Sequence, residues 1–357
     1  MSAKSVTIKS LAAYLGLTVG TVSRALNGYA DISPATRDRV QKAAQELGYR
    51  PNQNARRLSM GTSETVCYLM PRQIGTTVEP FVAQLLSGLG ESLNKRDWDL
   101  LVSHADTAQD DLTKLDKMLR SGRVSGVVIS RPLKNDPRIK LLQNLNIPFV
   151  VHGRTTACDT YAWYDVDGEE AMVTAVNHFV AQGHRRIAFI SAPLHHQFAQ
   201  QRLDGYRRGL NHNGLIADHD YVQITEFSDH GGQMAAAALL DLPHPPTAIV
   251  CVSDSVALGA MAAIRDRDLT IGHDISVIGY DGLSFGGHAN PPLTTLAQPQ
   301  AHAGRRLGDM LLAIIDGASP TSQQELQRAH LVRRMTDGPP PTTKGALPNV
   351  SEREELQ

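Results

Sequence analysis

The sequence predicts an α/β protein in which a small all-helical head precedes two doubly wound parallel-sheet subdomains. From residue 63 onward, apolar strand-like runs alternate with amphipathic stretches, as in parallel sheets covered by helices on both faces. Before that point, apolar residues recur at helical spacing between cap residues. These two patterns divide the chain into unlike parts.

Three short helices are expected in the head. Their expected cap and end residues are, in chain order, Thr7, Gly16, Thr18, Asn27, Ser33 and Gly48. Two short helices joined by about three residues and braced by a third form a helix-turn-helix unit. Pro51 then breaks the chain, and the segment NQNARRLS is too short to form a stable helix in water by itself.

Charge is divided unevenly along the chain. Residues 1–60 contain nine basic and three acidic residues, a net charge of +6, whereas the remainder contains 26 basic and 33 acidic residues, a net charge of −7. A basic head on an acidic body suggests a polyanionic partner for the head alone. Charge alone is equally compatible with an ordinary solvated surface.

The body contains more strands than one open sheet comfortably holds. Strand-like runs are expected at 65–70, 98–104, 124–130, 147–153, 186–191, 221–225, 247–253 and 275–280. Amphipathic stretches between them include 80–95, 110–121, 168–182, 202–213, 232–240 and 255–267. The strand spacing breaks near 155–165, which favours two subdomains. The tail after about residue 338 is rich in Pro, Thr and Glu and is expected to be disordered.

Several classes of protein are disfavoured by composition. Cys67, Cys158 and Cys251 are far apart and odd in number, which fits neither a disulfide framework nor a zinc site. No stretch approaches the roughly 18 apolar residues of a membrane span, and the N-terminus has no apolar signal-peptide core. We therefore expect a cytoplasmic protein with no membrane partner.

Common nucleotide-binding and metalloprotease motifs are absent from the sequence. It contains no GxxxxGK[ST], no GxGxxG after a strand and no HExxH. His195 and His196 follow a strand at the end where α/β folds bind ligands. Adjacent histidines point in different directions, and no further ligands stand at characteristic spacing, so polar loop residues are favoured over a metal site. We expect no catalytic residue, metal or cofactor.

A DNA-reading helix is the better-supported hypothesis. In a helix-turn-helix unit, the N-terminal residues of the second helix face base edges in the major groove. The residues in this position are Thr18, Val19, Gly20, Thr21, Ser23 and Arg24. Arg24 is suited to two-pronged pairing with guanine, which is worth roughly 1–3 kcal/mol of discrimination. Thr7, Thr21 and Asn27 offer phosphate contacts.

Longer segments of the chain resemble a known family. VTIKSLAAYLGLTVGTVSRALNG and ISPATRDRVQKAAQELGYRPNQNARRLS resemble the DNA-binding head of the lac/galactose repressor family over residues 6–60. The body continues the resemblance to about residue 336 with EPFVAQLLSGL, QRLDGYRRGL, SDSVALGAM, ISVIGYDG and PPLTTLAQP. This resemblance implies a homodimeric transcriptional regulator. Its body would be similar to periplasmic sugar-binding proteins, with a small effector between the subdomains.

The resemblance also implies roles for residues of the head and hinge. Val19, Gly20 and Arg24 match base-reading positions, and Leu58 matches a leucine that wedges into the minor groove. An apolar wedge of this kind kinks a flexible base step; the alternative is that Leu58 packs on its own linker. Further DNA contacts are implied for Asn52, Ala55 and Arg56. Gly20 would give up direct readout and let Val19 or the backbone approach the bases, unless it is a neutral accident on an exposed turn.

The effector site implied by the resemblance draws on both subdomains. Arg202 matches an arginine that grips ligand oxygens, and Asp281 matches an acceptor of sugar hydroxyls. The other implied contacts are Phe81, Ser130, Arg154, His230, Ser253 and Asp254. Alternatives remain open: Arg202 could pair with Asp204, Phe81 could belong to the core, and Asp254 could only cap a helix. Ser253 and Gly153 replace ligand-gripping groups of other members, so no relative's effector transfers directly.

We expect a head at 1–50, a hinge at 51–62, a body at 63–340 and a tail at 341–357. Within the body, the N-subdomain is expected at about 63–163 and 295–327, and the C-subdomain at about 164–294 and 328–340. The expected partners are a palindromic double-stranded DNA operator, a second copy of the chain, and a sugar effector such as an α-glucoside. The expected role is that of a repressor.

Two other functions remain to be discriminated. A solute receptor that feeds transport needs a signal peptide and no basic head, and residues 1–60 disagree with both requirements. An α/β enzyme fused to a DNA-binding head would convert its bound ligand, which turnover measurements would reveal.

Overall fold

The computed structural model describes residues 6–49, 63–70, 80–104 and 108–341. They belong to two compact units, a head within residues 1–63 and a body from residue 64 onward. The expected hinge, with Asn52, Ala55, Arg56 and Leu58, lies outside the described residues, as does the tail from residue 342. Their proposed roles therefore stay predictions.

Three helices form the head: α1 (Ile8–Leu15), α2 (Val19–Leu26) and α3 (Pro34–Glu46). The hydroxyls of Thr7, Thr18 and Ser33 each accept a hydrogen bond from a backbone N–H in the first turn of the helix that follows. Gly16 ends α1 with a φ of 65°, a conformation that glycine adopts without steric penalty. Apolar residues of all three helices meet in one core. The predicted helix-turn-helix unit is confirmed.

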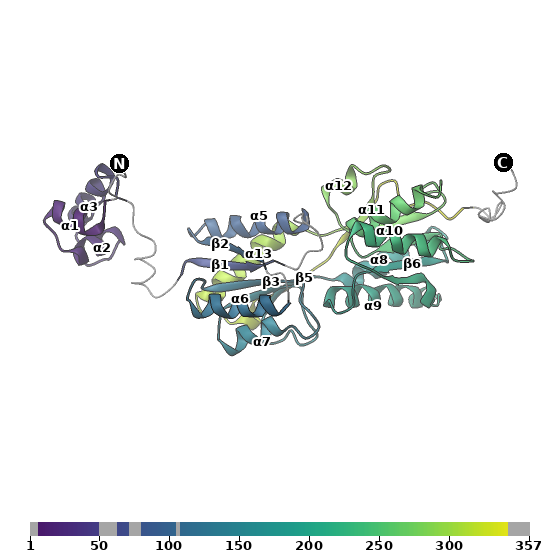
Figure 1. Ribbon diagram of the computed structural model, residues 1–357, viewed down its shortest axis with the longest axis horizontal. Coiled ribbons are helices and arrows are strands. Elements are labelled where there is room, and N and C mark those ends of the chain that lie inside the picture. Colours follow the sequence, from purple (N-terminus) through teal and green to yellow (C-terminus); the bar gives the residue numbers. More distant parts are fainter. Residues whose placement is uncertain (1–5, 50–62, 71–79, 105–107, 342–357) are drawn as a thin grey trace. The chain divides into compact units, whose positions relative to one another are not determined.

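A six-stranded parallel sheet forms the centre of the N-subdomain, in the order β11-β5-β4-β3-β1-β2. The strands are β1 (Thr65–Leu69), β2 (Asp99–Ser103), β3 (Gly126–Ser130), β4 (Phe149–His152), β5 (Ala162–Val166) and β11 (Gln324–Gln327). Helices α5 (Pro80–Asn94) and α13 (Gln300–Ile315) cover one face, and α6 (Ala108–Arg120) and α7 (Pro137–Asn144) the other (Figure 1).

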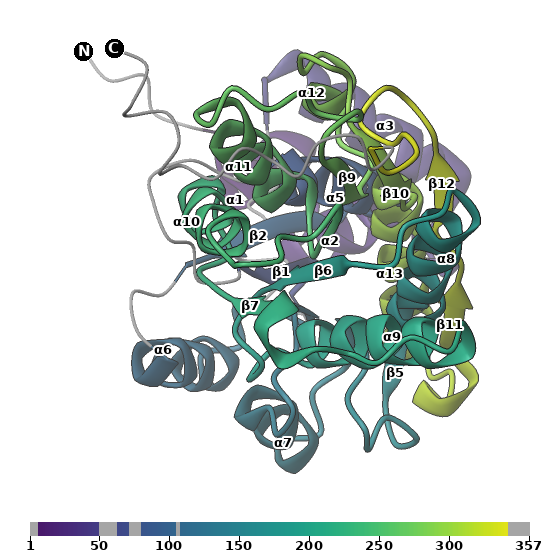
Figure 2. The same ribbon diagram turned by 90° about the vertical axis from the view of Figure 1, so that its right-hand side faces the viewer.

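The C-subdomain has a second six-stranded sheet in the order β12-β10-β9-β8-β6-β7, with only β12 antiparallel to its neighbour. The strands are β6 (Ile187–Ser191), β7 (Val222–Ile224), β8 (Ala248–Cys251), β9 (Ser276–Asp281), β10 (Thr294–Ala297) and β12 (His330–Val332). Helices α8 (Gly168–Ala181) and α9 (Gln197–His212) lie on one side of β6, and α10 (Asp229–Leu240) and α11 (Asp254–Arg265) on the other (Figure 2). A short α12 (Ser284–Gly287) follows β9, and single 3₁₀ turns lie at His219–Tyr221 and Pro320–Ser322.

The chain crosses between the two sheets three times: after β5, after β10 and after β11. The boundary expected between 163 and 164 therefore falls inside β5, which pairs with β4 and β11 in the first sheet. Likewise, β10 pairs with β9 in the second sheet, so the crossing expected at 295 comes later. Four strands that were not expected, β5, β10, β11 and β12, have three to five residues each, and all four mix polar with apolar residues.

Two further observations concern composition. All three cysteines are free, and Cys67 and Cys251 are buried. Among the described residues, no helix is long and apolar enough to cross a membrane.

Helices α5 and α13 pack so closely that glycine is required where they meet. A Cβ atom on Gly304 would overlap the backbone carbonyl of Leu85, and one on Gly88 would overlap the carbonyl of Ala301. The absence of side chains at these two positions lets the backbones touch.

We expect Gly304→Ala to destabilise the N-subdomain by about 1–3 kcal/mol, because the added methyl forces the two helices apart. Both tryptophans of the chain, Trp98 and Trp163, lie in this subdomain, so their fluorescence during urea unfolding follows it. Gly90→Ala on α5 is the control, since nothing lies within 4 Å of its added methyl. It should be neutral or stabilise by up to about 1 kcal/mol. Equal midpoints for the two variants would contradict the close approach.

Candidate functional site

The exposed face of α2 carries residues that were expected to read DNA. Val22 and Ala25 are buried in the head core, whereas Val19, Gly20 and Arg24 are exposed. Val19 is 41% exposed although it is apolar, and folding of the head offers no reason for that exposure. A methyl-bearing side chain on this face is suited to contact with a thymine methyl group.

The polar residues of this face are already joined by local hydrogen bonds. The Thr18 Oγ1 atom lies 2.9 Å from Thr21 Oγ1, and Asn27 donates from Nδ2 to Ser23 Oγ at 3.5 Å. Thr7 is occupied as the α1 cap through Ser10. A hydroxyl or amide has more than one bonding position, so these groups keep capacity for a phosphate oxygen.

A second site lies in the body, where strands of both sheets end. It is a pocket with about 600 Å³ of empty space, part of it open to solvent. The loops after β3, β4 and β5 line it from the N-subdomain, and the ends of β9 and β10 line it together with α9 from the C-subdomain. Ligands of open α/β folds bind at such carboxyl ends.

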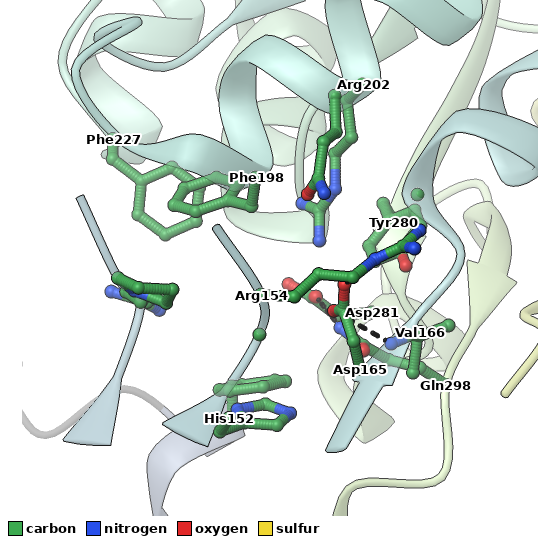
Figure 3. Close-up of a pocket in the computed structure, with 16 residues that line it drawn as sticks. His152, Arg154, Asp165, Val166, Phe198, Arg202, Phe227, Tyr280, Asp281 and Gln298 are labelled. Carbon is green, nitrogen blue, oxygen red and sulfur yellow. Dashed lines mark hydrogen bonds and ion pairs between the residues drawn. The ribbon is translucent and has the colours of Figure 1, made fainter. Parts of the chain in front are cut away.

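Arg202 reaches into this pocket from α9 (Figure 3). Its Nη1 donates to the carbonyl of Val252 at 2.6 Å, and its guanidinium carbon lies 3.6 Å from the centre of the Tyr280 ring. The residue is only 8% exposed, and its Nε has no hydrogen-bond partner among the described residues. The alternative pairing with Asp204 is not formed, because Asp204 accepts from Gln200 instead. A buried donor without a partner is suited to a ligand oxygen.

Two buried carboxyl groups face the same space. Asp281 accepts from Gln298 Nε2 at 2.7 Å and has a φ of 120°, which is rare for a residue other than glycine. Burial raises the pKa of Asp281 to about 7, although Arg202 acts in the opposite direction. Asp165 accepts from Arg154 Nε at 3.0 Å, and burial raises its pKa to about 6 against the effect of Arg154. Near neutral pH, such groups can meet a ligand hydroxyl as acceptor or as donor.

Aromatic rings form the apolar part of the lining. Phe198 and Phe227 pack edge to face, with ring centres 5.5 Å apart, and Phe81 stacks on His152 at 5.6 Å. Burial lowers the pKa of His152 to about 4, and Arg131 and Arg202 contribute in the same direction. The imidazole is therefore neutral at pH 7 and completes an uncharged aromatic wall.

The structure brings four of the expected effector residues into the pocket: Phe81, Arg154, Arg202 and Asp281. The other four expected residues do not line it. Ser253 accepts from the backbone N–H of Val256 as the cap of α11. Asp254 is fully buried, where it accepts from the Leu283 backbone and the Thr295 hydroxyl at 2.7 and 2.6 Å. Ser253 is thus occupied in capping α11, and Asp254 joins α11 to β10 and to the turn after β9.

Ser130 and His230 also lie away from the lining, for different reasons. Ser130 is fully buried at the end of β3, and His230 is exposed on the first turn of α10. Phe227, which lies in the loop just before α10, lines the pocket instead.

Sequence reasoning missed twelve lining residues: Arg131, Pro132, His152, Gly153, Asp165, Val166, Gly168, Phe198, Gln201, Phe227, Tyr280 and Gln298. Some of them, such as Arg131 and Tyr280, end strands that had been expected, so their position at a carboxyl end was an available signal. Asp165 and Gln298 belong to or follow strands that had not been expected. Their proximity to Arg202 comes from the way the two subdomains face each other.

The segment around the paired histidines joins the two subdomains beside the pocket. The Lys134 backbone donates to the carbonyl of His195 at 3.3 Å, and the Gln197 backbone donates to the carbonyl of Pro132 at 3.1 Å. Leu133 and His196 form an isolated antiparallel bridge. No cluster of metal-binding side chains is found within the described part of the chain. His195 and His196 are thus loop residues at a contact between subdomains.

The helix-turn-helix head is suited to binding DNA, and the polar and aromatic pocket of the body is suited to a small ligand. Together these two sites indicate an effector-controlled, DNA-binding regulator. Comparison with models of known protein families supports this assignment for both the head and the body. Residues 7–52 match the model for bacterial regulatory proteins of the lacI family, and residues 176–336 match the periplasmic binding protein-like domain.

Individual relatives match over most of their length. The HTH-type transcriptional regulator AglR of Rhizobium meliloti is 37% identical over 350 residues, covering 97% of this chain and 98% of that protein. RafR of Escherichia coli is 32% identical over 319 residues, covering 89% and 94%. The lac repressor dimer bound to operator and the anti-inducer ONPF has a TM-score of 0.83 at 28% identity, covering 94% and 100%. The CelR–cellobiose complex has a TM-score of 0.73 at 29% identity, covering 93% and 99%.

The chain therefore belongs to the LacI family of transcriptional regulators. It is a DNA-binding regulator with a periplasmic-binding-protein-like effector domain. The relatives reported above are regulators of transcription, which agrees with the expectation that this protein is not an enzyme.

We expect Asp281 to make the protein without effector less stable as the pH rises from about 4 to about 7. A carboxyl group whose pKa rises on folding binds more protons in the folded state over this range, so its contribution to the free energy of unfolding decreases with pH. The lowered pKa of His152 acts in the opposite direction up to about pH 6.5, so the test compares variants. Asp281→Asn cannot ionise, and raising the pH from about 5 to about 8 should therefore lower its thermal midpoint less, or raise it more, than that of the wild type, with half-exposed Asp204→Asn as control. Equal changes in all three proteins would contradict the raised pKa of Asp281.

Proposed function

We propose that this chain is a repressor that binds a palindromic operator as a homodimer and is controlled by a sugar in the pocket between its subdomains. The observation that carries the choice of effector is that a buried arginine, Arg202, and a buried aspartate, Asp281, line the same pocket beside aromatic rings. A sugar hydroxyl both donates and accepts hydrogen bonds, so one ligand can engage a guanidinium and a carboxyl group together. The apolar faces of a sugar ring fit the aromatic wall.

The proposed DNA target follows from symmetry and charge. A relative of known structure is a dimer bound to operator, and a two-fold symmetric protein reads mirrored half-sites. The net charge of +6 in residues 1–60 supports a phosphate-rich partner. Operator affinity should accordingly fall steeply with salt, because binding releases counterions from the DNA.

Control by the effector requires the two subdomains to respond to it. A ligand held by Arg202 on α9 and Arg154 after β4 would contact both subdomains and favour one relative position of the two. An almost complete switch from 1:99 to 99:1 needs about 5.5 kcal/mol of differential affinity. We propose that this change reaches DNA through the separation of the two hinges, 51–62, in a dimer.

A thermal-shift screen of sugars and sugar phosphates, with α-glucosides tested first, would identify the effector, since a ligand that binds the folded state raises the unfolding temperature. A hit among the neutral sugars supports the proposal. A response confined to sugar phosphates, or to compounds without hydroxyl groups, would contradict it.

We expect Arg202→Ala to abolish the response of operator binding to the effector while operator affinity itself is retained. The substitution removes a buried guanidinium whose Nε has no hydrogen-bond partner among the described residues. Losing a hydrogen bond between this charged group and the ligand would cost about 1.5–3 kcal/mol of binding free energy. Gel-shift titrations with and without effector measure both quantities. Arg207→Ala, on the solvent side of the same helix with its side chain 49% exposed, should respond like the wild type. A full response in Arg202→Ala would reject Arg202 as a ligand contact.

We expect Gly20→Ala to stabilise the head by up to about 1 kcal/mol and to change the preferred operator sequence. The new methyl has space, since its nearest neighbour would be Thr18 Oγ1 at 3.8 Å, and it would project from the face proposed to read bases. Circular dichroism of thermal unfolding measures the first effect, and selection from randomised DNA measures the second. An unchanged preferred sequence would show that Gly20 is only a local weak point of α2.

A further inference from the structure

Arg24 contacts a carboxylate from the turn that follows its own helix. Its Nη2 lies 2.6 Å from Asp31 Oδ2, and its guanidinium carbon lies 5.4 Å from the centre of the Tyr29 ring. The side chains of Arg24 and Asp31 are 53% and 47% exposed. Ion pairs this exposed add little to folding stability. The main effect of this ion pair is therefore to fix the position of the Arg24 guanidinium.

The turn that carries Asp31 is itself held in place by the backbone. The Tyr29 N–H donates to the carbonyl of Arg24 at 3.1 Å, and the Ile32 N–H donates to the carbonyl of Tyr29 at 3.2 Å. From α3, Arg37 Nη2 donates to the same Tyr29 carbonyl at 3.0 Å. The carboxylate thus approaches Arg24 from a turn that is fastened to both α2 and α3.

We infer that Asp31 is a positioning residue for operator recognition, which it serves by holding Arg24 in the orientation that reads guanine. This inference rests on the base-reading role proposed for Arg24. A guanidinium has five N–H donors in a rigid fork, so the contact with Asp31 leaves others for the O6 and N7 atoms of guanine. A side chain that is already oriented loses less rotamer freedom when it binds.

The charge of Asp31 adds a second effect on specificity. A carboxylate on the DNA-facing side of the head is repelled by phosphates on any sequence. On the preferred operator this cost is offset by the oriented contact of Arg24, whereas on unrelated DNA nothing offsets it. Removing the charge should therefore change the affinities for the two kinds of DNA in opposite directions.

The test uses the full-length protein and three duplexes: the operator selected from randomised DNA, the same operator with the guanine read by Arg24 replaced, and an unrelated sequence. We expect Asp31→Asn to bind the selected operator about three- to tenfold more weakly and to lose up to about tenfold of its discrimination at the replaced guanine. Its affinity for unrelated DNA should be higher, because a repelling charge is removed. Fluorescence anisotropy at fixed salt measures all three affinities, and circular dichroism verifies that the head is folded.

Asp38→Asn is the matched control, because Asp38 is exposed on α3 and its replacement removes the same charge from the head without removing the partner of Arg24. It should tighten binding to all three duplexes by a common factor. If Asp31→Asn does the same, Asp31 acts only through its charge and the inference is overturned.

Arg24→Ala separates this inference from the proposed function. If Arg24→Ala leaves the selected sequence unchanged, the base-reading role of Arg24 is wrong, and the inference falls with it. If Arg24→Ala alters the preference but Asp31→Asn does not, only the positioning role is wrong. In an Arg24→Ala background, Asp31→Asn should produce only the uniform effect of charge, since the side chain it positions is gone.

Discussion

The parallel pairing of strands in both sheets is the constraint that creates the pocket. Parallel strands all end at the same edge of a sheet, so β3, β4 and β5 deliver their last residues together, as do β9 and β10. The chain crosses between the sheets three times, and these edges face one another across the pocket. Residues far apart in the sequence, such as Phe81 and Gln298, thereby share one lining.

The electrostatics of the pocket follow from that burial. Asp165 and Asp281 lie where water has little access, and burial raises both pKa values toward neutrality. Arg154 and Arg202 lower these pKa values again in part, so that both carboxyl groups can still ionise near neutral pH. Such a site can exchange a hydrogen-bond donor for an acceptor at little cost, which is suited to a ligand rich in hydroxyl groups. Asp281 also has an uncommon backbone conformation, with a φ of 120°, and strain of this kind is often found at functional sites.

The head uses its few residues for two purposes, to form a core and to expose one face of α2. Its core uses one face of each helix, so the opposite face of α2 is free of any packing role. That freedom permits three exposed residues, Val19, Gly20 and Arg24, none of which the fold requires. The turn after α2 then places Asp31 against Arg24, so the loop that connects two helices also contributes to the proposed reading surface.

Local patterns in the sequence predicted much of this architecture. Caps, glycine ends and helical spacing located α1, α2 and α3, and apolar runs located eight strands, because these features depend on neighbours within a few residues. The motif around Arg202 and Asp281 likewise pointed to two residues of the pocket. Such signals identify an element or a family position without placing it in space.

Only the tertiary structure decided which side chains meet. Asp254 and Ser253 stand in the sequence where a ligand contact was expected, yet Ser253 caps α11 and Asp254 bonds to the Thr295 hydroxyl of β10. Phe227, rather than His230, enters the pocket, and Asp165 joins it from a strand whose pairing depends on β11, more than 150 residues away. Contacts of this kind depend on long-range packing and on the competition of several partners for one polar group. A local sequence pattern contains no information about either.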